Sequence, residues 1–449
     1  MRLTFHCFFV LFFWCSVSAQ QQSQDFYFLK KRKSTQLSFE LINNLLVVPV
    51  WVNGQKLSFL LDSGVGMTLL FNNARVSNLY FQEKNAFKLT GLGQGKALKA
   101  YLTRGNTLQL GKIKADNLSI LLVDENDFEF AKRMGTQIDG VLGHAFLKDY
   151  AIKINYESQK ITIIKTPKKK LNVAQSQWYP LTFFRDKPHI PISFSLRDGH
   201  LQTGYFLIDT GSSDALWLFD QKAGIEKTPP TFEDYLGRGI NGNIFGSRGK
   251  ISFVQLANET LRRVKVAYPE MENFQSIAIH PQRVGSIGGE LLRRFTIYLD
   301  YPNKRMGLIP NRSIDAPFYF NLSGIELQHN GVELIRKKLN NANNVLTDES
   351  GNNRGIEIFL RDVIRYELQN IIEVTHVREG SPAAEAGVMV GDVLDRINGR
   401  KLHHLKLHQV IGLLQRKPGK KIKLSLRRQG EPLLVRFELR SLFDGSLDF

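Results

Sequence analysis

Two short segments of this sequence place an aspartate where it could carry chemistry. The first reads LLDSG and contains Asp62, and the second reads LIDTG and contains Asp209. In both, the aspartate follows an apolar run typical of a strand, which is a costly position for a carboxyl group that serves no purpose. The glycine two residues later permits a tight turn and lets backbone N–H groups approach the carboxylate. Asp62 and Asp209 are therefore candidates for general acid–base chemistry.

The two aspartates occupy equivalent places in an internal repeat. They lie 147 positions apart, and a second pair of similar segments, beginning at Leu142 and at Ile287, is 145 positions apart. Two pairs of similar segments with nearly the same spacing imply that this part of the chain is a duplication. In each copy, short runs rich in Val, Ile, Leu and Phe alternate with polar residues and are separated by Gly, Asn and Asp, a pattern typical of mostly antiparallel strands. Each copy is predicted to be a compact β lobe.

On these motifs, residues from about 35 to 310 resemble the retropepsin-like and pepsin-like aspartic peptidases. The resemblance includes two later apolar, apolar, Gly steps, which end at Gly143 and Gly288. It implies a pseudo-two-fold dimer of β lobes in which the two Asp-containing loops meet at the axis. It also implies flaps over the cleft, which we place at Gly91–Gly95 and Gly237–Gly242. The residues expected to support the catalytic loops are Ser63, Gly64, Thr210, Gly211, Ser212, Gly143 and Gly288.

The chemistry that follows from the resemblance depends on two carboxylates held close together. Because like charges at such a distance cannot both ionise cheaply, the pair shares one proton and titrates as a unit. The ionised member takes a proton from a bound water, which attacks the scissile carbonyl, while the protonated member donates to the developing oxyanion. We expect no metal and no cofactor. Ser212 follows the second motif and Val65 the first, which predicts that Asp209 carries the charge more often and Asp62 the proton.

The segment Glu379–Gly399 resembles the PDZ domain of exported bacterial peptidases. The resemblance implies a groove between a strand and a helix expected near Leu405–Gln415. Such a groove binds a peptide C-terminus or another extended segment by strand addition. Two alternative segments could form its leading edge, and the sequence leaves both open. They are Gly324, Ile325 and Leu327, or Gly355, Ile356 and Ile358.

Four segments are expected along the chain, because 449 residues exceed what one hydrophobic core usually holds. They are a signal peptide at 1–19, a first lobe at 35–166, a second lobe at 171–312, and a PDZ domain with an insertion at 315–443. The fold class is therefore mainly β, with an α/β domain at the end.

The first residues have the pattern of an export signal: Met1 and Arg2 precede an apolar run to Trp14 and a small-residue cleavage site at Ala19. Both cysteines of the chain lie in this segment, so the mature protein would have no disulfide. No later stretch is apolar enough to cross a membrane. We expect a periplasmic or secreted chain. Its net charge of +18 comes from scattered Lys and Arg, a distribution that does not favour a nucleic-acid partner.

Two hypotheses of function follow. The first is an aspartic endopeptidase that acts on proteins or peptides as a monomer, since one chain supplies both lobes, with the PDZ domain selecting or holding peptides. The alternative is a non-catalytic scaffold in which decayed peptidase lobes and the PDZ domain only bind peptides. Retention of both Asp62 and Asp209 favours the enzyme.

Overall fold

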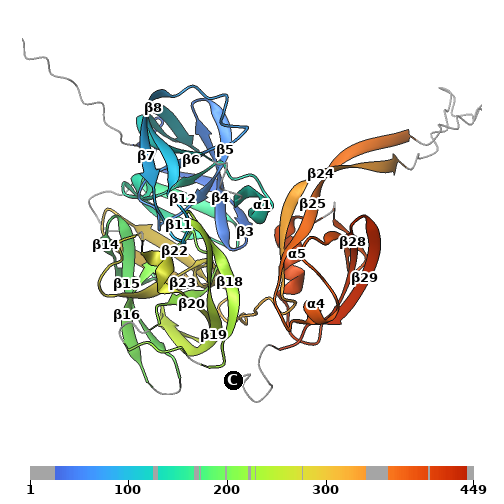
Figure 1. The fold of residues 1–449 in the computed structure, drawn as a ribbon. Helices are drawn as coiled ribbons and strands as arrows, with labels where there is room; N and C mark the ends of the chain where they lie inside the picture. Colours follow the sequence, from blue (N-terminus) through green and yellow to red (C-terminus); the bar gives the residue numbers. More distant parts are fainter. Residues whose placement is uncertain are drawn as a thin grey trace, which may run out of the picture.

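The computed structural model describes most of the chain after the expected signal peptide. The described residues are 26–124, 130–165, 171, 173–197, 200–220, 224–227, 229–275, 277–339, 363–402 and 405–441. The expected signal peptide at 1–19 and the groove candidates Gly355, Ile356 and Ile358 lie outside these ranges. The described part is mainly β, as the sequence predicts, and its strands form four sheets (Figure 1).

The first sheet contains Asp62 directly after β5. Its order is β1-β9-β6-β10-β5-β4-β8-β7, with β3 on β4. The strands are β1 (Tyr27–Phe28), β3 (Glu40–Ile42), β4 (Leu45–Val52), β5 (Gln55–Leu61), β6 (Leu69–Asn72), β7 (Gln82–Leu89), β8 (Leu98–Leu110), β9 (Ile113–Asp124) and β10 (Gly140–Leu142). Helix α1 (Phe130–Met134) lies between β9 and β10, and α2 (His144–Leu147) follows β10.

The next sheet contains Asp209 in the corresponding place, directly after β16. Its order is β14-β15-β16-β21-β17-β20-β19-β18. The strands are β14 (Thr182–Phe184), β15 (Lys187–Ser195), β16 (Gln202–Ile208), β17 (Leu216–Leu218), β18 (Phe232–Gly239), β19 (Gly242–Leu256), β20 (Glu259–Pro269) and β21 (Arg283–Ile287). A 3-10 helix, η2 (Met271–Phe274), precedes β21, and α3 (Gly289–Leu292) follows it.

These two sheets repeat one pairing pattern around their aspartates. Strand β5 pairs in parallel with β10, and β16 pairs in parallel with β21. Strand β6 is antiparallel to β10 and parallel to β9, just as β17 is antiparallel to β21 and parallel to β20. The repeat seen in the sequence therefore reappears as a repeat of strand pairings.

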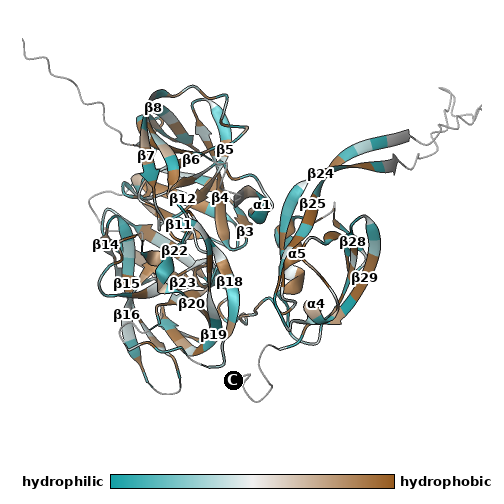
Figure 2. Ribbon diagram, viewed as in Figure 1, coloured by the Kyte–Doolittle hydropathy of each residue, from teal (hydrophilic) through white to brown (hydrophobic). Residues whose placement is uncertain are grey.

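A third sheet joins the two copies. Its order is β13-β23-β22-β11-β12-β2, and its central pair, β11 with β22, takes one strand from each copy. The strands are β2 (Ser34–Ser38), β11 (Tyr150–Asn155), β12 (Lys160–Lys165), β13 (Gln177–Pro180), β22 (Phe295–Asp300) and β23 (Arg305–Pro310). Hydrophobic and hydrophilic residues alternate along many of the strands (Figure 2), which lets each sheet bury one face. A single apolar cluster, from Phe26 to Phe318, runs through both copies.

The fourth sheet has its own core, which extends from Phe320 to Leu439. Its order is β24-β25-β26-β28-β29, with β27 on β26. The strands are β24 (Ile325–Leu339), β25 (Val363–Val377), β26 (Val393–Ile397), β27 (Arg400–Lys401), β28 (Lys421–Arg428) and β29 (Glu431–Glu438). Its helices are α4 (Pro382–Glu385) and α5 (Leu407–Leu414). None of the helices in the described residues is long and apolar enough to cross a membrane.

Candidate active site

Each aspartate is held at the end of its strand by a backbone bond to the neighbouring support strand. The Asp62 N–H donates to the Leu142 carbonyl at 3.0 Å, and the Asp209 N–H donates to the Ile287 carbonyl at 2.9 Å. The glycine that follows each support strand packs directly on the Asp-containing loop. A Cβ at Gly143 would lie 2.2 Å from the Val65 carbonyl oxygen, and one at Gly288 would lie 2.3 Å from that of Asp214. A larger residue would push the loop away, so these glycines fix where the carboxyl groups lie.

The two loops meet through a reciprocal set of buried hydrogen bonds. The Ser63 N–H donates to Thr210 Oγ1 at 3.0 Å, and the Thr210 N–H donates to Ser63 Oγ at 3.1 Å. The Ser63 hydroxyl donates to the Ile208 carbonyl at 2.6 Å, and the Thr210 hydroxyl donates to the Leu61 carbonyl at 2.8 Å. Each hydroxyl therefore ties its own loop to the strand of the other copy.

Replacing Thr210 with Val is expected to destabilise the fold by about 2 to 4 kcal/mol. The change removes the hydroxyl and leaves the Ser63 N–H and the Leu61 carbonyl buried without that partner. Urea unfolding monitored by circular dichroism measures the difference. Thr162→Val is the matched control, because Thr162 Oγ1 accepts an exposed hydrogen bond from Gln36. An equal effect of the two changes would contradict the role of Thr210.

The carboxyl groups of Asp62 and Asp209 lie against each other's loops. A Cβ at Gly211 would lie 2.2 Å from Asp62 Cγ, and one at Gly64 would lie 3.1 Å from an oxygen of each aspartate. The Gly64 N–H donates to Asp62 Oδ1 at 2.7 Å, and the Gly211 N–H donates to Asp209 Oδ1 at 3.1 Å. Gly211 is needed here for space, since a side chain would occupy the position of the Asp62 carboxyl group, and a Cβ at Gly64 would make a tight contact with both aspartates.

Burial of this pair raises the pKa of both aspartates. For Asp62, burial and then the charge of Asp209 raise the pKa to about 7. For Asp209, burial raises the pKa, while the charges of Arg283 and Lys187 oppose the rise. Arg283 acts on Asp209 and not on Asp62 among the named causes, so its charge favours the ionised form of Asp209. That Asp209 carries the charge more often than Asp62 stays a prediction.

The groups that favour the charge on Asp209 differ from the one expected. The Ser212 backbone N–H donates to the Asp209 carbonyl at 3.3 Å, but within the described part of the chain its hydroxyl does not bond the Asp209 carboxyl group and instead packs at the Gly288 position. The charges of Arg283 and Lys187 take that role. Arg283 is buried in β21, where its Nε–H donates to the Gly285 carbonyl at 2.9 Å.

Sequence reasoning did not identify Arg283 or Lys187. A signal for Arg283 is present, since it is a charged residue in the strand RVGSI that leads to Gly288. Burial lowers the pKa of Arg283 to about 10, and burial also lowers the pKa of Lys187. Lys187 is the first residue of β15. The corresponding strand of the first sheet, β4, begins with the buried Leu45, so the internal repeat does not indicate a charged residue at this position.

The two expected flap segments contact each other. Residues Gly91–Gly95 lie between β7 and β8, and Gly237–Gly242 span the turn between β18 and β19. The Asn241 N–H donates to the Leu92 carbonyl at 2.8 Å, and the Gly95 N–H donates to the Asn241 carbonyl at 2.5 Å. The Asn241 amide also donates to the Lys96 carbonyl at 2.8 Å. We call these two segments the flap tips, and in this structure they are joined.

In the fourth sheet, Gly324, Ile325 and Leu327 mark the start of β24. This strand is an edge of its sheet, paired with β25 among the described residues, and it packs against α5. Gly324 has a φ of +81°, and a Cβ there would lie 2.3 Å from Ser381 Oγ. Of the two alternative groove edges, this one therefore lies beside the helix. Among the described residues, no group of three or more His, Cys, Asp or Glu side chains is placed to hold a metal ion.

Comparison with known families agrees with these two parts of the chain. Residues 48–146 match the family model described as aspartyl protease, and residues 373–428 match that of the PDZ domain. The first match contains Asp62 and its support glycine Gly143. The chain thus carries a retropepsin-like aspartyl protease domain and a PDZ domain, which confirms the two resemblances over residues 48–146 and 373–428.

Proposed function

We propose that this protein is an exported aspartic endopeptidase with one active site, built from two homologous lobes of a single chain. The observation that carries the proposal is the meeting of the two Asp-containing loops. Residues 147 positions apart exchange reciprocal hydrogen bonds, and both carboxyl groups lie half-buried side by side. The repeated strand pairing supports the pseudo-two-fold relation of the lobes.

The proposed reaction uses one charged and one protonated carboxyl group. The Asp209 carboxylate accepts a proton from a bound water, whose oxygen bonds to the scissile carbonyl carbon. Asp62 gives its proton to the carbonyl oxygen, which forms a gem-diol. The C–N bond then breaks, the leaving amine takes the proton held by Asp209, and a gem-diol hydroxyl returns a proton to Asp62. The pair ends in its starting state.

The charges near the pair suit this division of roles. Arg283 and Lys187 favour the ionised form of Asp209 and so oppose the rise in its pKa that burial causes, which suits a base. Burial keeps the proton on Asp62 up to about pH 7, so the acid is available over the same range. The alternative function, a scaffold that only binds peptides, does not need two carboxyl groups with these opposed properties.

One chain is expected to bind one transition-state analogue. Because both lobes contribute to one site, a peptide containing statine, whose hydroxyl resembles that of the gem-diol, should titrate to about one inhibitor per chain. Calorimetric titration of the full chain measures the stoichiometry, and Asp209→Asn is the control that should weaken binding. One inhibitor per two chains, or two per chain, would contradict the two-lobe proposal.

A further inference from the structure

The edge of the PDZ domain where β24 meets α5 is covered by the protease part of the chain. Helix α1 packs against β24, and Figure 1 shows α1 on the side of the first sheet that faces β24 and α5. Gly135, directly after α1, touches the first residue of α5. A Cβ at Gly135 would lie 2.3 Å from the Cβ of Leu407. The segment from α1 to Gly135 therefore lies against both walls of the expected groove.

An ion pair connects the same two parts of the chain at the start of α5. Lys406, the residue that precedes α5, pairs with Glu40 of β3. Glu40 belongs to the first sheet and Lys406 to the PDZ domain, so the pair exists only when the two parts are docked. Both side chains are partly exposed, which makes them accessible to substitution without damage to either core.

A second contact connects the PDZ domain to the strand that carries a flap tip. Arg378, which follows β25, lies 3.7 Å from Asp234 of β18. The rings of Phe232, also in β18, and Phe320, in the PDZ core, are 5.3 Å apart and nearly perpendicular. Strand β18 leads directly to Asn241, the residue that joins the two flap tips.

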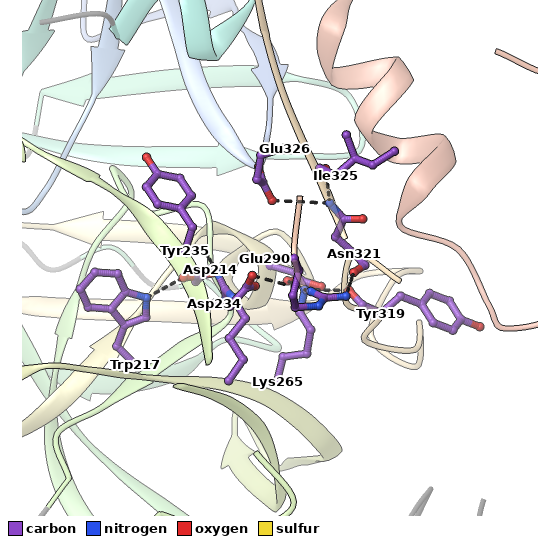
Figure 3. Close-up of polar contacts among 12 residues, drawn as sticks. Asp214, Trp217, Asp234, Tyr235, Lys265, Glu290, Tyr319, Asn321, Ile325 and Glu326 are labelled. Carbon is purple, nitrogen blue, oxygen red and sulfur yellow. Dashed lines mark hydrogen bonds and ion pairs between the residues drawn. The ribbon is translucent and has the colours of Figure 1, made fainter. Parts of the chain in front are cut away.

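The charged groups at this contact continue into the protease part (Figure 3). Arg248 of β19 donates to Asp234 at 2.9 Å and to Asp214 at 2.8 Å. Asp214 in turn accepts from the Trp217 indole at 2.6 Å. Asp214 lies in the loop after Asp209, and its carbonyl packs on Gly288. A row of partly buried ionic contacts thus runs from the PDZ domain through the flap strand to the second catalytic loop.

We propose that a peptide with a free C-terminal carboxylate binds between β24 and α5 in competition with α1, and that its binding releases β18 and eases the opening of the flap tips. We call the arrangement seen in the structure, with α1 packed against β24, the docked form, and in this form the PDZ domain restrains β18. In it, substrate entry requires the flap tips to separate while the PDZ domain still holds β18. The second half of this inference rests on the proposed function, because it predicts a change in peptidase activity.

The proposal requires reciprocity between docking and peptide binding. A peptide that binds only the undocked form is weakened by the fraction of molecules that remain docked. A change that abolishes docking must therefore tighten peptide binding, by a factor equal to the inverse of the fraction of wild-type molecules that are undocked. This gives a measurement that does not depend on catalysis.

Gly135→Asn is the sharpest test, because it places a side chain against Leu407 only in the docked form. Gly135 has a φ of +65°, a conformation that Asn tolerates better than other residues with a side chain. Gly224→Asn is the matched control: Gly224 has a φ of +73°, and no atom lies within 4 Å of its Cβ position. Lys406→Glu is a second disruption, and the exchange Glu40→Lys with Lys406→Glu should restore docking.

The probes are fluorescein-labelled decapeptides that end in Val, Leu or Phe with a free carboxylate, and the same peptides with amidated ends. We expect Gly135→Asn to bind the free-carboxylate peptides about tenfold more tightly than wild type. We expect Lys406→Glu to act in the same direction, and the charge exchange and Gly224→Asn to match wild type. Equal affinity of Gly135→Asn and wild type, or no binding by either, would overturn the proposal.

The activity measurement uses a short, internally quenched peptide with an amidated end, which cannot occupy the groove. Saturating decapeptide should speed its cleavage severalfold in wild type and have little effect on Gly135→Asn, which is already released. Slower cleavage by the released forms would overturn the coupling to the flap tips. If no protein cleaves the substrate, the proposed function fails, and the affinity comparison alone decides whether α1 covers the groove.

Discussion

Replacing Asp209 with Asn is expected to lower kcat/KM for peptide cleavage by about 10³- to 10⁴-fold. Asn has nearly the shape of Asp but cannot accept a proton, so the water loses the base that activates it. The oxygen of the new side-chain amide can still accept the N–H of Gly211, as Asp209 Oδ1 does at 3.1 Å. The loss should therefore appear in the chemistry and not in the fold. Steady-state kinetics with an internally quenched peptide measures it.

The control for this experiment is Asp116→Asn, the same chemical change on an exposed strand. Asp116 bonds Lys114 and Tyr27 at the surface of the first sheet, far along the chain from either catalytic loop. It should retain the wild-type rate. An Asp209→Asn protein that is folded and cleaves within tenfold of wild type would exclude Asp209 as the base.

Asp62→Asn is expected to stabilise the protein at pH 7, on the order of 3 kcal/mol. The pKa of Asp62 is about 7 in the folded protein, against an ordinary value of 3.8. A folded pKa raised above the unfolded value gives a contribution that is fully present below pH 3.8 and is lost as the pH rises through 7. The Asn side chain does not ionise, so the variant does not lose this stability as the pH rises.

Unfolding measured at pH 4, 5.5 and 7 tests this prediction. The difference between Asp62→Asn and wild type should be small at pH 4 and grow toward pH 7. Asp116→Asn should show the opposite sign, because hydrogen bonds from Lys114 and Tyr27 lower the pKa of Asp116 and its charge stabilises the folded state. A gain that does not depend on pH would mean that burial of the Asp62 carboxyl group does not cause it.

The pair of aspartates could be identified from the sequence because each lies in a repeated local pattern. The motifs LLDSG and LIDTG, together with the glycines at 143 and 288, carry enough information to predict that the two loops correspond. The strand pairing then follows, since β5 with β10 and β16 with β21 use the same residues of the repeat. The charged groups beside Asp209, in contrast, were not predicted.

The features that the sequence did not predict depend on contacts between segments that lie far apart along the chain. Arg283 and Lys187 act on Asp209 because β21 and β15 flank β16. A charged residue in the strand before Gly288 is a signal for Arg283, but no local motif indicates Lys187. The start of β24 could not be separated from the segment at 355–358 because both have the pattern Gly, Ile, Glu, apolar. The contact of Gly135 with Leu407 has no local signal at all, because a glycine after a short helix is ordinary in any fold.

Incubation of the mature chain with a peptide library in water enriched in ¹⁸O is the most direct test of peptide hydrolysis by the Asp62 and Asp209 pair. Mass spectrometry would compare wild type with Asp62→Asn and Asp209→Asn between pH 3 and pH 8. We predict that wild type produces new C-termini that carry one ¹⁸O from the attacking water, and that both variants lose these products. Absence of cleavage by wild type across this range, or equal cleavage by the variants, would contradict this mechanism.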